Sequence, residues 1–175
     1  KIENISKNIH LVEGDILDVS SLKNAMEGMD YIIHAAAIVS FSPKNRAQMY
    51  KVNVEGTANV VNCALRHASI KKLVFVSSIA ALGRPSTAEV MSGNPITENQ
   101  KWEDSPLNSH YAISKLQAEC EVWRAHAEGL PVVILIPTII LGEGDWTQSS
   151  TQLFKYVFDE NKFLTEGSIN YVDVE

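Results

Sequence analysis

The run Tyr31-Ile32-Ile33-His34-Ala35 is the first of three apolar stretches that decide the fold. A continuous apolar run of this length predicts a strand buried on both faces, as in a parallel sheet. Lys72-Leu73-Val74-Phe75-Val76-Ser77 and Pro131-Val132-Val133-Ile134-Leu135-Ile136-Pro137 have the same character. Residues 9–13 predict a further short strand, which ends at Gly14-Asp15.

Segments with helical periodicity separate these strands. Residues 20–28 predict a short amphipathic helix capped by Ser20 or Ser21, and residues 45–68 predict a long helix. A third helix runs from Tyr111 through Ala127, and an irregular section, residues 83–109, precedes it. The alternation predicts an α/β fold, a doubly wound parallel sheet of the Rossmann-like kind.

Composition and charge exclude several classes of protein. The chain has 175 residues, 45% of them hydrophobic, and a net charge of −6, so no nucleic-acid partner is expected. No apolar run reaches membrane-spanning length, and the two cysteines, Cys63 and Cys120, belong to no CxxC motif. Both thiols are expected to be reduced and buried in a cytoplasmic protein. The histidines show no metal-ligand spacing, so no metal site is predicted.

Small and polar residues end the predicted strands. Because ligands of such folds bind beyond the carboxyl ends of the strands, these positions are candidates for a binding site. Each also has an ordinary structural explanation, namely a turn residue at Asp15, tight helix packing at the alanines and a polar strand end at the serines. The candidates are Asp15, Ala35, Ala36, Ala37, Ser77, Ser78, Pro137 and Thr138.

Tyr111 and Lys115 lie four residues apart and therefore on one face of the predicted helix. An ammonium beside a phenol favours the phenolate and lowers the tyrosine pKa from about 10. Such a tyrosine can donate or accept a proton near neutral pH. Taken alone, the pair is also compatible with an ordinary surface helix.

In their order along the chain, these motifs resemble the extended branch of the short-chain dehydrogenase/reductase superfamily, the NAD-dependent epimerase/dehydratase group. The resemblance rests on Val76-Ser77-Ser78, Tyr111-x-x-x-Lys115 and the run from Pro137 to Gly142, and it covers nearly the whole chain. The strings HAAAIVSF (34–41) and SKLQAE (114–119) look most like dihydroflavonol 4-reductase and 3β-hydroxysteroid dehydrogenase relatives.

The resemblance implies an NAD(P)-dependent oxidoreductase that interconverts a ketone and a secondary alcohol on a mostly apolar small molecule. It implies that Tyr111 is the proton donor or acceptor, that Lys115 tunes Tyr111 and binds the nicotinamide ribose, and that Ser78 binds the substrate oxygen. Asn53 is implied to be structural or part of a proton relay. The implied cofactor contacts are Asp15, Ile16, Ala35, Ala36, Ala37, Ser77, Tyr111, Lys115, Pro137 and Ile140.

Two other functions stay open: a nucleotide-sugar epimerase or dehydratase, and a non-enzymatic dinucleotide-binding protein. Ile136 speaks against the first, because the sugar-nucleotide enzymes usually carry arginine there. The intact Ser78, Tyr111 and Lys115 set speaks against the second, because a mere binder needs no proton donor. The partner expected is a small molecule, and the protein is expected to be a monomer or homodimer.

The chain contains no GxxGxxG turn, the motif that places a pyrophosphate at a helix N-terminus. It is therefore expected to be a piece of a longer protein, without the first βαβ unit, in which the choice between NAD and NADP is unreadable. The expected domains are a partial dinucleotide-binding domain over 1–141, the start of a substrate-binding lobe over 142–168, and a strand returning to the sheet over 169–175.

Overall fold

A computed structural model describes residues 9–143, 149–162 and 170–173 of the chain. Three strands, β1 (Tyr31–His34), β2 (Lys72–Val76) and β3 (Val132–Leu135), form a parallel sheet in that spatial order. The register pairs Ile32 with Leu73 and Phe75 with Ile134. This sheet with its connecting helices confirms the predicted parallel α/β fold.

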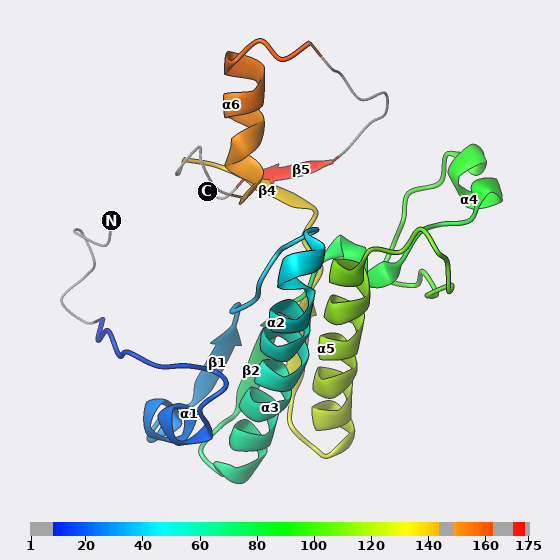
Figure 1. Ribbon diagram of the computed structural model, residues 1–175. Helices are drawn as coiled ribbons and strands as arrows, with labels where there is room; N and C mark the ends of the chain where they lie inside the picture. The colour runs from blue at the N-terminus through cyan, green and yellow to red at the C-terminus, as the bar shows by residue number, and fades with distance from the viewer. Residues whose placement is uncertain (1–8, 144–148, 163–169, 174–175) are drawn as a thin grey trace.

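Three helices, α1 (Val19–Met26), α3 (Thr57–Arg66) and α5 (His110–Ala127), pack on the same face of the sheet (Figure 1). Side chains alternate along a strand, so every second strand residue points toward these helices. The resulting core contains Leu22, Met26, Val60, Val61, Cys63, Ala64, Ile70, Leu73, Phe75, Ala118, Val122, Ala125 and Leu130.

The opposite face of the sheet carries exposed apolar side chains. Ile33 is 75% exposed, Tyr31 64% and Leu135 49%, although all three lie in apolar strand sequences. The prediction that β1 is buried on both faces is therefore wrong for the described part of the chain. The physical reason is that the helices described there supply one covering layer only.

The predicted long helix is a rod made of several helical forms. It begins with η1 (Pro43–Asn45) and α2 (Arg46–Tyr50), continues as the π-helical segment η2 (Lys51–Gly56) and ends as α3. The backbone stays in the right-handed helical region at each junction. A π-helical turn within an α-helix is rare and often marks a functional position. Here it carries the buried Asn53.

The remaining elements lie beyond the ends of the sheet. They comprise η3 (Ile79–Leu82), α4 (Thr87–Ser92), η4 (Ser149–Thr151) and α6 (Gln152–Phe158), with β4 (Ile139–Leu141) paired in parallel to β5 (Tyr171–Asp173). Gly83, with φ of 76°, follows η3, and a Cβ there would lie 3.0 Å from the Trp102 ring. Trp102 therefore holds the segment 84–109 against the end of η3. The prediction that this segment is irregular throughout is wrong, because it contains α4.

Three local expectations are wrong. Residues 9–13 form no strand, because no described strand pairs with them, and Leu11 and Val12 are exposed. Helix α1 is capped by Asp18, whose side chain accepts a hydrogen bond from the Ser20 N–H, and not by either predicted serine. Cys120 is exposed, whereas Cys63 is buried as expected.

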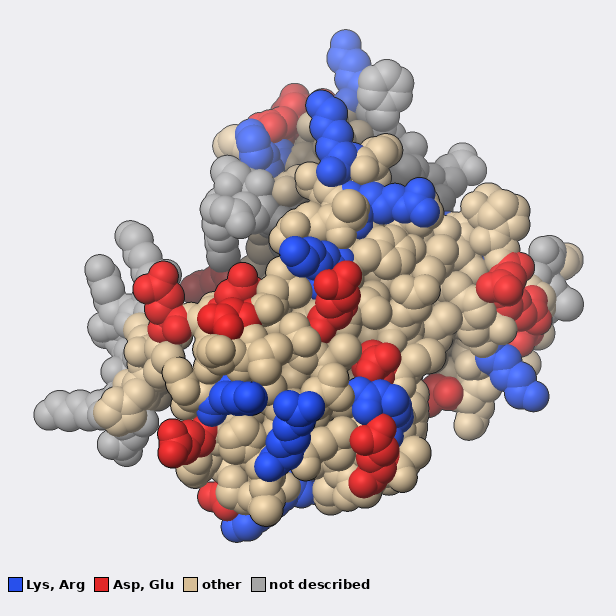
Figure 2. Space-filling view, turned by 60° about the horizontal axis from the view of Figure 1, so that its bottom comes forward, with Lys and Arg blue, Asp and Glu red and all other residues tan. Residues whose placement is uncertain are grey.

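The visible surface in Figure 2 carries acidic and basic side chains interspersed over its lower half, with uncharged side chains between them. This mixing suits a net charge of −6 and offers no continuous basic face there. Over the described ranges, helices that combine the length and the apolar character needed to cross a bilayer are absent.

Candidate active site

Helix α5 presents Tyr111 and Lys115 to the carboxyl end of β2. Ser109 begins the helix, and its Oγ accepts a hydrogen bond of 3.1 Å from the Ala112 N–H. This cap fixes the first turn, where Tyr111 is half-buried. The buried face of α5 is unusual for an amphipathic helix because it includes the polar residues Ser114, Lys115 and Glu119. Buried polar side chains of this kind indicate a functional site.

Lys115 is a buried cation, with 2% of its surface exposed. Its Nζ donates a hydrogen bond of 2.8 Å to the Val76 carbonyl and lies 4.4 Å from the centre of the Phe75 ring. Burial lowers the pKa of Lys115 to about 8, and the nearby Glu119 carboxylate acts in the opposite direction. The ammonium is thus held at the end of β2, one helical turn from Tyr111.

The structure brings Ser78 close to Tyr111, since the Ser78 side chain influences the pKa of the phenol. Burial raises the pKa of the Tyr111 phenol above its usual value, and the nearby Ser78 side chain counteracts the rise. The expected lowering of the tyrosine pKa by Lys115 is therefore wrong for this structure. The lysine Nζ is directed at the Val76 carbonyl, and the phenol stays protonated at neutral pH.

The predicted alanines Ala35, Ala36 and Ala37 follow β1 at the same edge of the sheet as Ser78, and all three are exposed. The Asn53 side chain forms two hydrogen bonds with the backbone of Ile38, the next residue of this loop. The Ile38 N–H donates to the Asn53 Oδ1 at 2.8 Å, and the Asn53 amide donates to the Ile38 carbonyl at 3.0 Å.

The loop then reaches Phe41, which is 76% exposed. Its ring contacts the Tyr111 ring edge-on, with 6.1 Å between the two ring centroids. An exposed aromatic ring in contact with the candidate proton donor supplies an apolar wall at this point.

The Asp15-Ile16 turn lies against the helical rod. The Ile16 side chain packs directly against Gly56. A Cβ at position 56 would lie only 2.5 Å from the Ile16 Cδ1, so this contact requires glycine. The Asn59 amide donates to the Ile16 carbonyl at 3.1 Å. Asp15 is exposed, and its Oδ1 accepts from the Leu17 N–H at 2.8 Å.

Three further candidates already make contacts within the protein. The Ser77 hydroxyl is buried and donates to the Glu119 Oε2 at 2.6 Å. The Pro137 carbonyl accepts from the Ile79 N–H at 3.0 Å. The Ile140 carbonyl in β4 accepts from the hydroxyl of Ser150 in η4 at 2.5 Å. These three residues stay predictions as cofactor contacts.

A buried hydrogen-bond chain continues from Asn53 under the site. The Thr57 hydroxyl donates to the Asn53 carbonyl at 2.6 Å, so its oxygen accepts from the His34 Nε2 at 2.9 Å. The Nε2 of His34 therefore carries the proton in this arrangement. Burial lowers the pKa of His34 to about 4, and the charge of Lys115 adds to that effect.

His34 makes folding stability dependent on pH. Its pKa is about 4 in the folded chain against 6.5 when unfolded, so the unfolded state binds more protons between these values. The free energy of unfolding should fall as pH drops through this window, by about 3 kcal/mol from this residue. His34→Gln should flatten that part of the pH dependence in urea melts. His126→Gln, at an exposed position, serves as the control, and an equal slope for both variants would contradict the assignment.

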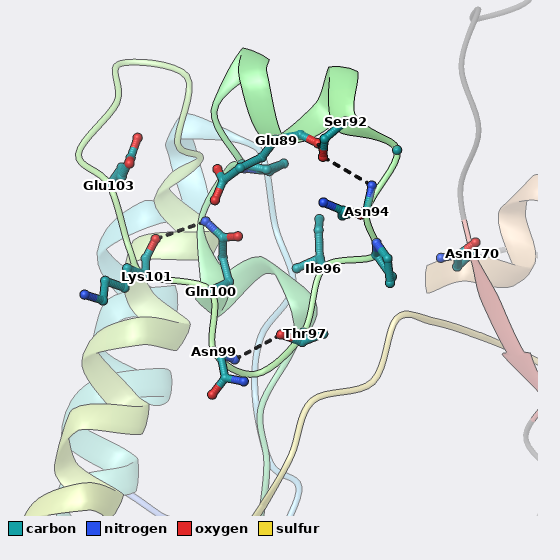
Figure 3. A pocket seen from close by; sticks show the side chains of 13 residues that line it. Glu89, Ser92, Asn94, Ile96, Thr97, Asn99, Gln100, Lys101, Glu103 and Asn170 are labelled. Carbon is teal, nitrogen blue, oxygen red and sulfur yellow. Dashed lines mark hydrogen bonds between the residues drawn. The ribbon is translucent and has the colours of Figure 1, made fainter.

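A polar cavity of about 840 Å³ lies apart from these residues, between the segment 85–103 and Asn170 (Figure 3). Its polar groups bond mainly with one another, as the Gln100 side chain does with the Lys101 carbonyl. None of the candidate residues lines it. In the described ranges, moreover, no group of metal-ligating side chains is assembled.

Sequence reasoning missed the buried role of Glu119, the His34–Thr57 pair and the contact of Phe41 with Tyr111. Glu119 had a readable signal, since it lies one helical turn after Lys115 and two after Tyr111. The other contacts join residues far apart in the sequence, so periodicity alone does not reveal them.

Comparison with known proteins gives consistent matches. The sequence profile of the 3-beta hydroxysteroid dehydrogenase/isomerase family matches residues 1–172. The chain is 26% identical to anthocyanidin reductase of Arabidopsis thaliana over 96% of its own length and 54% of the relative's. It is 30% identical to a putative dihydroflavonol 4-reductase of Synechocystis over 95% of the chain and 47% of the relative. The chain thus spans about half the length of these relatives.

Among solved structures, a short-chain dehydrogenase/reductase superfamily protein from Agrobacterium tumefaciens with bound NAD superimposes with a TM-score of 0.65. The two sequences are 29% identical, and the match covers 77% of this chain and 39% of the other. These similarities agree with the fold described above.

Proposed function

Because the chain belongs to the 3-beta hydroxysteroid dehydrogenase/isomerase family, we propose that the full-length protein is an NAD(P)-dependent oxidoreductase. Its reaction interconverts a ketone and a secondary alcohol on a mostly apolar small molecule. The observation that carries the proposal is the placement of Ser78 close to Tyr111, with the buried Lys115 one helical turn away. Named reductases among the relatives support the same class of reaction.

The residues at the sheet edge fit a nicotinamide dinucleotide. Exposed alanines at positions 35–37 leave room for close approach to the backbone, and Asp15 has an exposed carboxylate for a hydrogen-bond donor of the ligand. Lys115 offers a cation for ribose hydroxyls. When bound, the dinucleotide supplies or accepts the hydride. Ser77, Pro137 and Ile140 complete the proposed set of contacts.

The side chains of the site supply position and a proton. Ser78 donates a hydrogen bond to the substrate oxygen and aligns it with the Tyr111 hydroxyl. Tyr111 then gives its proton to that oxygen as the carbonyl carbon is reduced. Lys115, one helical turn away, holds the ribose hydroxyls of the dinucleotide beside this proton donor. A raised tyrosine pKa keeps this donor protonated at neutral pH, which favours carbonyl reduction.

The apolar wall formed by Phe41 supports an apolar substrate next to the proton donor. The test is a substrate panel with the full-length protein and reduced NAD or NADP, followed by the absorbance of the reduced nicotinamide. Aryl and alicyclic ketones are expected to be reduced, whereas UDP- and dTDP-sugars are not. Turnover of the sugar nucleotides alone would favour the epimerase or dehydratase reaction. Binding without turnover of any compound would favour a non-enzymatic protein.

A further inference from the structure

Glu119 is a buried carboxylate that the reaction described above does not use. It is 8% exposed, and both of its oxygens accept hydrogen bonds. The Ser77 hydroxyl donates to Oε2 at 2.6 Å, and the Trp123 indole N–H donates to Oε1 at 3.2 Å. These two hydrogen bonds compensate the loss of water around the carboxylate, since an unpaired buried charge is strongly unfavourable.

The position of Glu119 on α5 links it to the site. Tyr111, Lys115, Glu119 and Trp123 follow one another at intervals of four residues and share one face of the helix. Through Ser77 the carboxylate also reaches β2 directly beyond Val76, whose carbonyl binds the Lys115 ammonium. Glu119 and Lys115 therefore attach consecutive turns of α5 to consecutive residues at the end of β2.

Lys115 meets few other charges. From α5 it faces Glu119 and Tyr111, and from β1 it faces His34, which is neutral at neutral pH. The neighbouring part of β2 offers the Val76 carbonyl and the Phe75 ring, neither of which titrates. Glu119 is consequently the negative charge that opposes the desolvation of this cation.

We propose that Glu119 is a positioning residue of the site, which anchors α5 to β2 through Ser77 and keeps the buried Lys115 protonated. It acts on the substrate through Lys115 and Tyr111 and touches no reacting atom. This inference rests on the proposed function for its catalytic consequence. Its electrostatic part concerns Lys115 alone and is measurable without turnover.

The test follows the Lys115 ε-carbon by NMR in full-length protein labelled with ¹³C-lysine, with the signal assigned by Lys115→Arg. In the unaltered protein the titration midpoint should lie near the pKa of about 8. Glu119→Gln keeps the side-chain size and removes the charge, so the midpoint should fall by about one pH unit. Glu119→Asp retains the charge and should recover at least half of that fall.

Glu121→Gln is the matched control, because Glu121 lies on the same helix but pairs with Arg124. It should leave the Lys115 midpoint unchanged. An unchanged midpoint in Glu119→Gln, or an equal fall in Glu121→Gln, would overturn the proposal. If Glu119→Gln does not fold, the unaltered protein decides: the Glu119 carboxyl carbon should show an inflection at the Lys115 midpoint, and its absence would overturn the proposal.

Activity gives the second readout. In Glu119→Gln, the high-pH limb of the kcat/KM profile should shift to lower pH by the same amount as the Lys115 midpoint. If the unaltered protein reduces no ketone, the proposed function fails, while the NMR titration still judges the role of Glu119. If the protein is active and the Lys115 midpoint is the same in the unaltered protein and in Glu119→Gln, only the proposal about Glu119 fails.

Discussion

Replacing Tyr111 with Phe is expected to lower kcat for ketone reduction by about 10²–10⁴-fold, the usual contribution of a positioned general acid. The substitution removes only the hydroxyl near Ser78 and keeps the ring that contacts Phe41. Dinucleotide affinity should change little, because the ammonium of Lys115 stays in place. Steady-state kinetics and fluorescence titration of the reduced dinucleotide measure the two effects.

Tyr50→Phe provides the matched control for this change. Tyr50 also carries a hydroxyl next to α5, where it bonds to the His110 Nδ1 at 3.3 Å, but it does not contact Ser78. Its loss should leave kcat within about twofold of the unaltered value, because surface substitutions of this kind have small effects. Full activity of the Tyr111→Phe protein would remove Tyr111 from its proposed role.

Replacing Asn53 with Ala is expected to destabilise the fold by about 4 kcal/mol. Asn53 is 1% exposed and satisfies the N–H and the carbonyl of Ile38, and it also donates to the Ser114 Oγ at 3.0 Å. Removal of the amide leaves the N–H and the carbonyl of Ile38 unsatisfied, each at a cost of about 1–3 kcal/mol, while the Ser114 hydroxyl keeps its bond to the Tyr111 carbonyl. It also releases the loop that carries the alanines at 35–37, so dinucleotide affinity should fall as well.

Urea unfolding of full-length protein measures the loss of stability. Asn62→Ala is the comparison, because Asn62 is an exposed residue of α3 whose side-chain oxygen accepts a hydrogen bond of 2.9 Å from the Arg124 Nη2. That substitution should lower the free energy of unfolding by less than about 1 kcal/mol. Equal unfolding free energies for the two variants would show that Asn53 does not hold the loop.

The sequence was sufficient to predict the parallel α/β fold, because long apolar runs and helical periodicity are local signals. The family was predicted from the resemblance of its motifs, in their order along the chain, to a known superfamily. The predicted helix from Tyr111 to Ala127 agrees with α5 (His110–Ala127), bounded by its Ser109 cap and by Gly129 with φ of 102°. The predicted resemblance to the 3β-hydroxysteroid dehydrogenase group is confirmed by the family match.

Features that depend on tertiary contacts were not predictable in the same way. A strand at residues 9–13 required a pairing partner that periodicity does not supply. The residues of the π-helical turn around Asn53 have the same hydrophobic pattern as an α-helix. The turn differs from an α-helix only in its backbone hydrogen bonds, which the sequence does not reveal. The direction of the Tyr111 pKa shift depended on burial and on where the Lys115 Nζ points, which the four-residue spacing left undetermined.

The most direct test of the proposed oxidoreductase is the stoichiometry of one reaction of the full-length protein with a ketone and reduced dinucleotide. Chromatography quantifies the alcohol formed, and absorbance gives the reduced dinucleotide consumed. The two amounts should be equal, and with Tyr111→Phe both should fall at least about 10²-fold in the same reaction time. Conversion of the substrate to an isomer or a dehydrated product without net consumption of reduced dinucleotide, as in an epimerase or dehydratase, would contradict the proposed reaction.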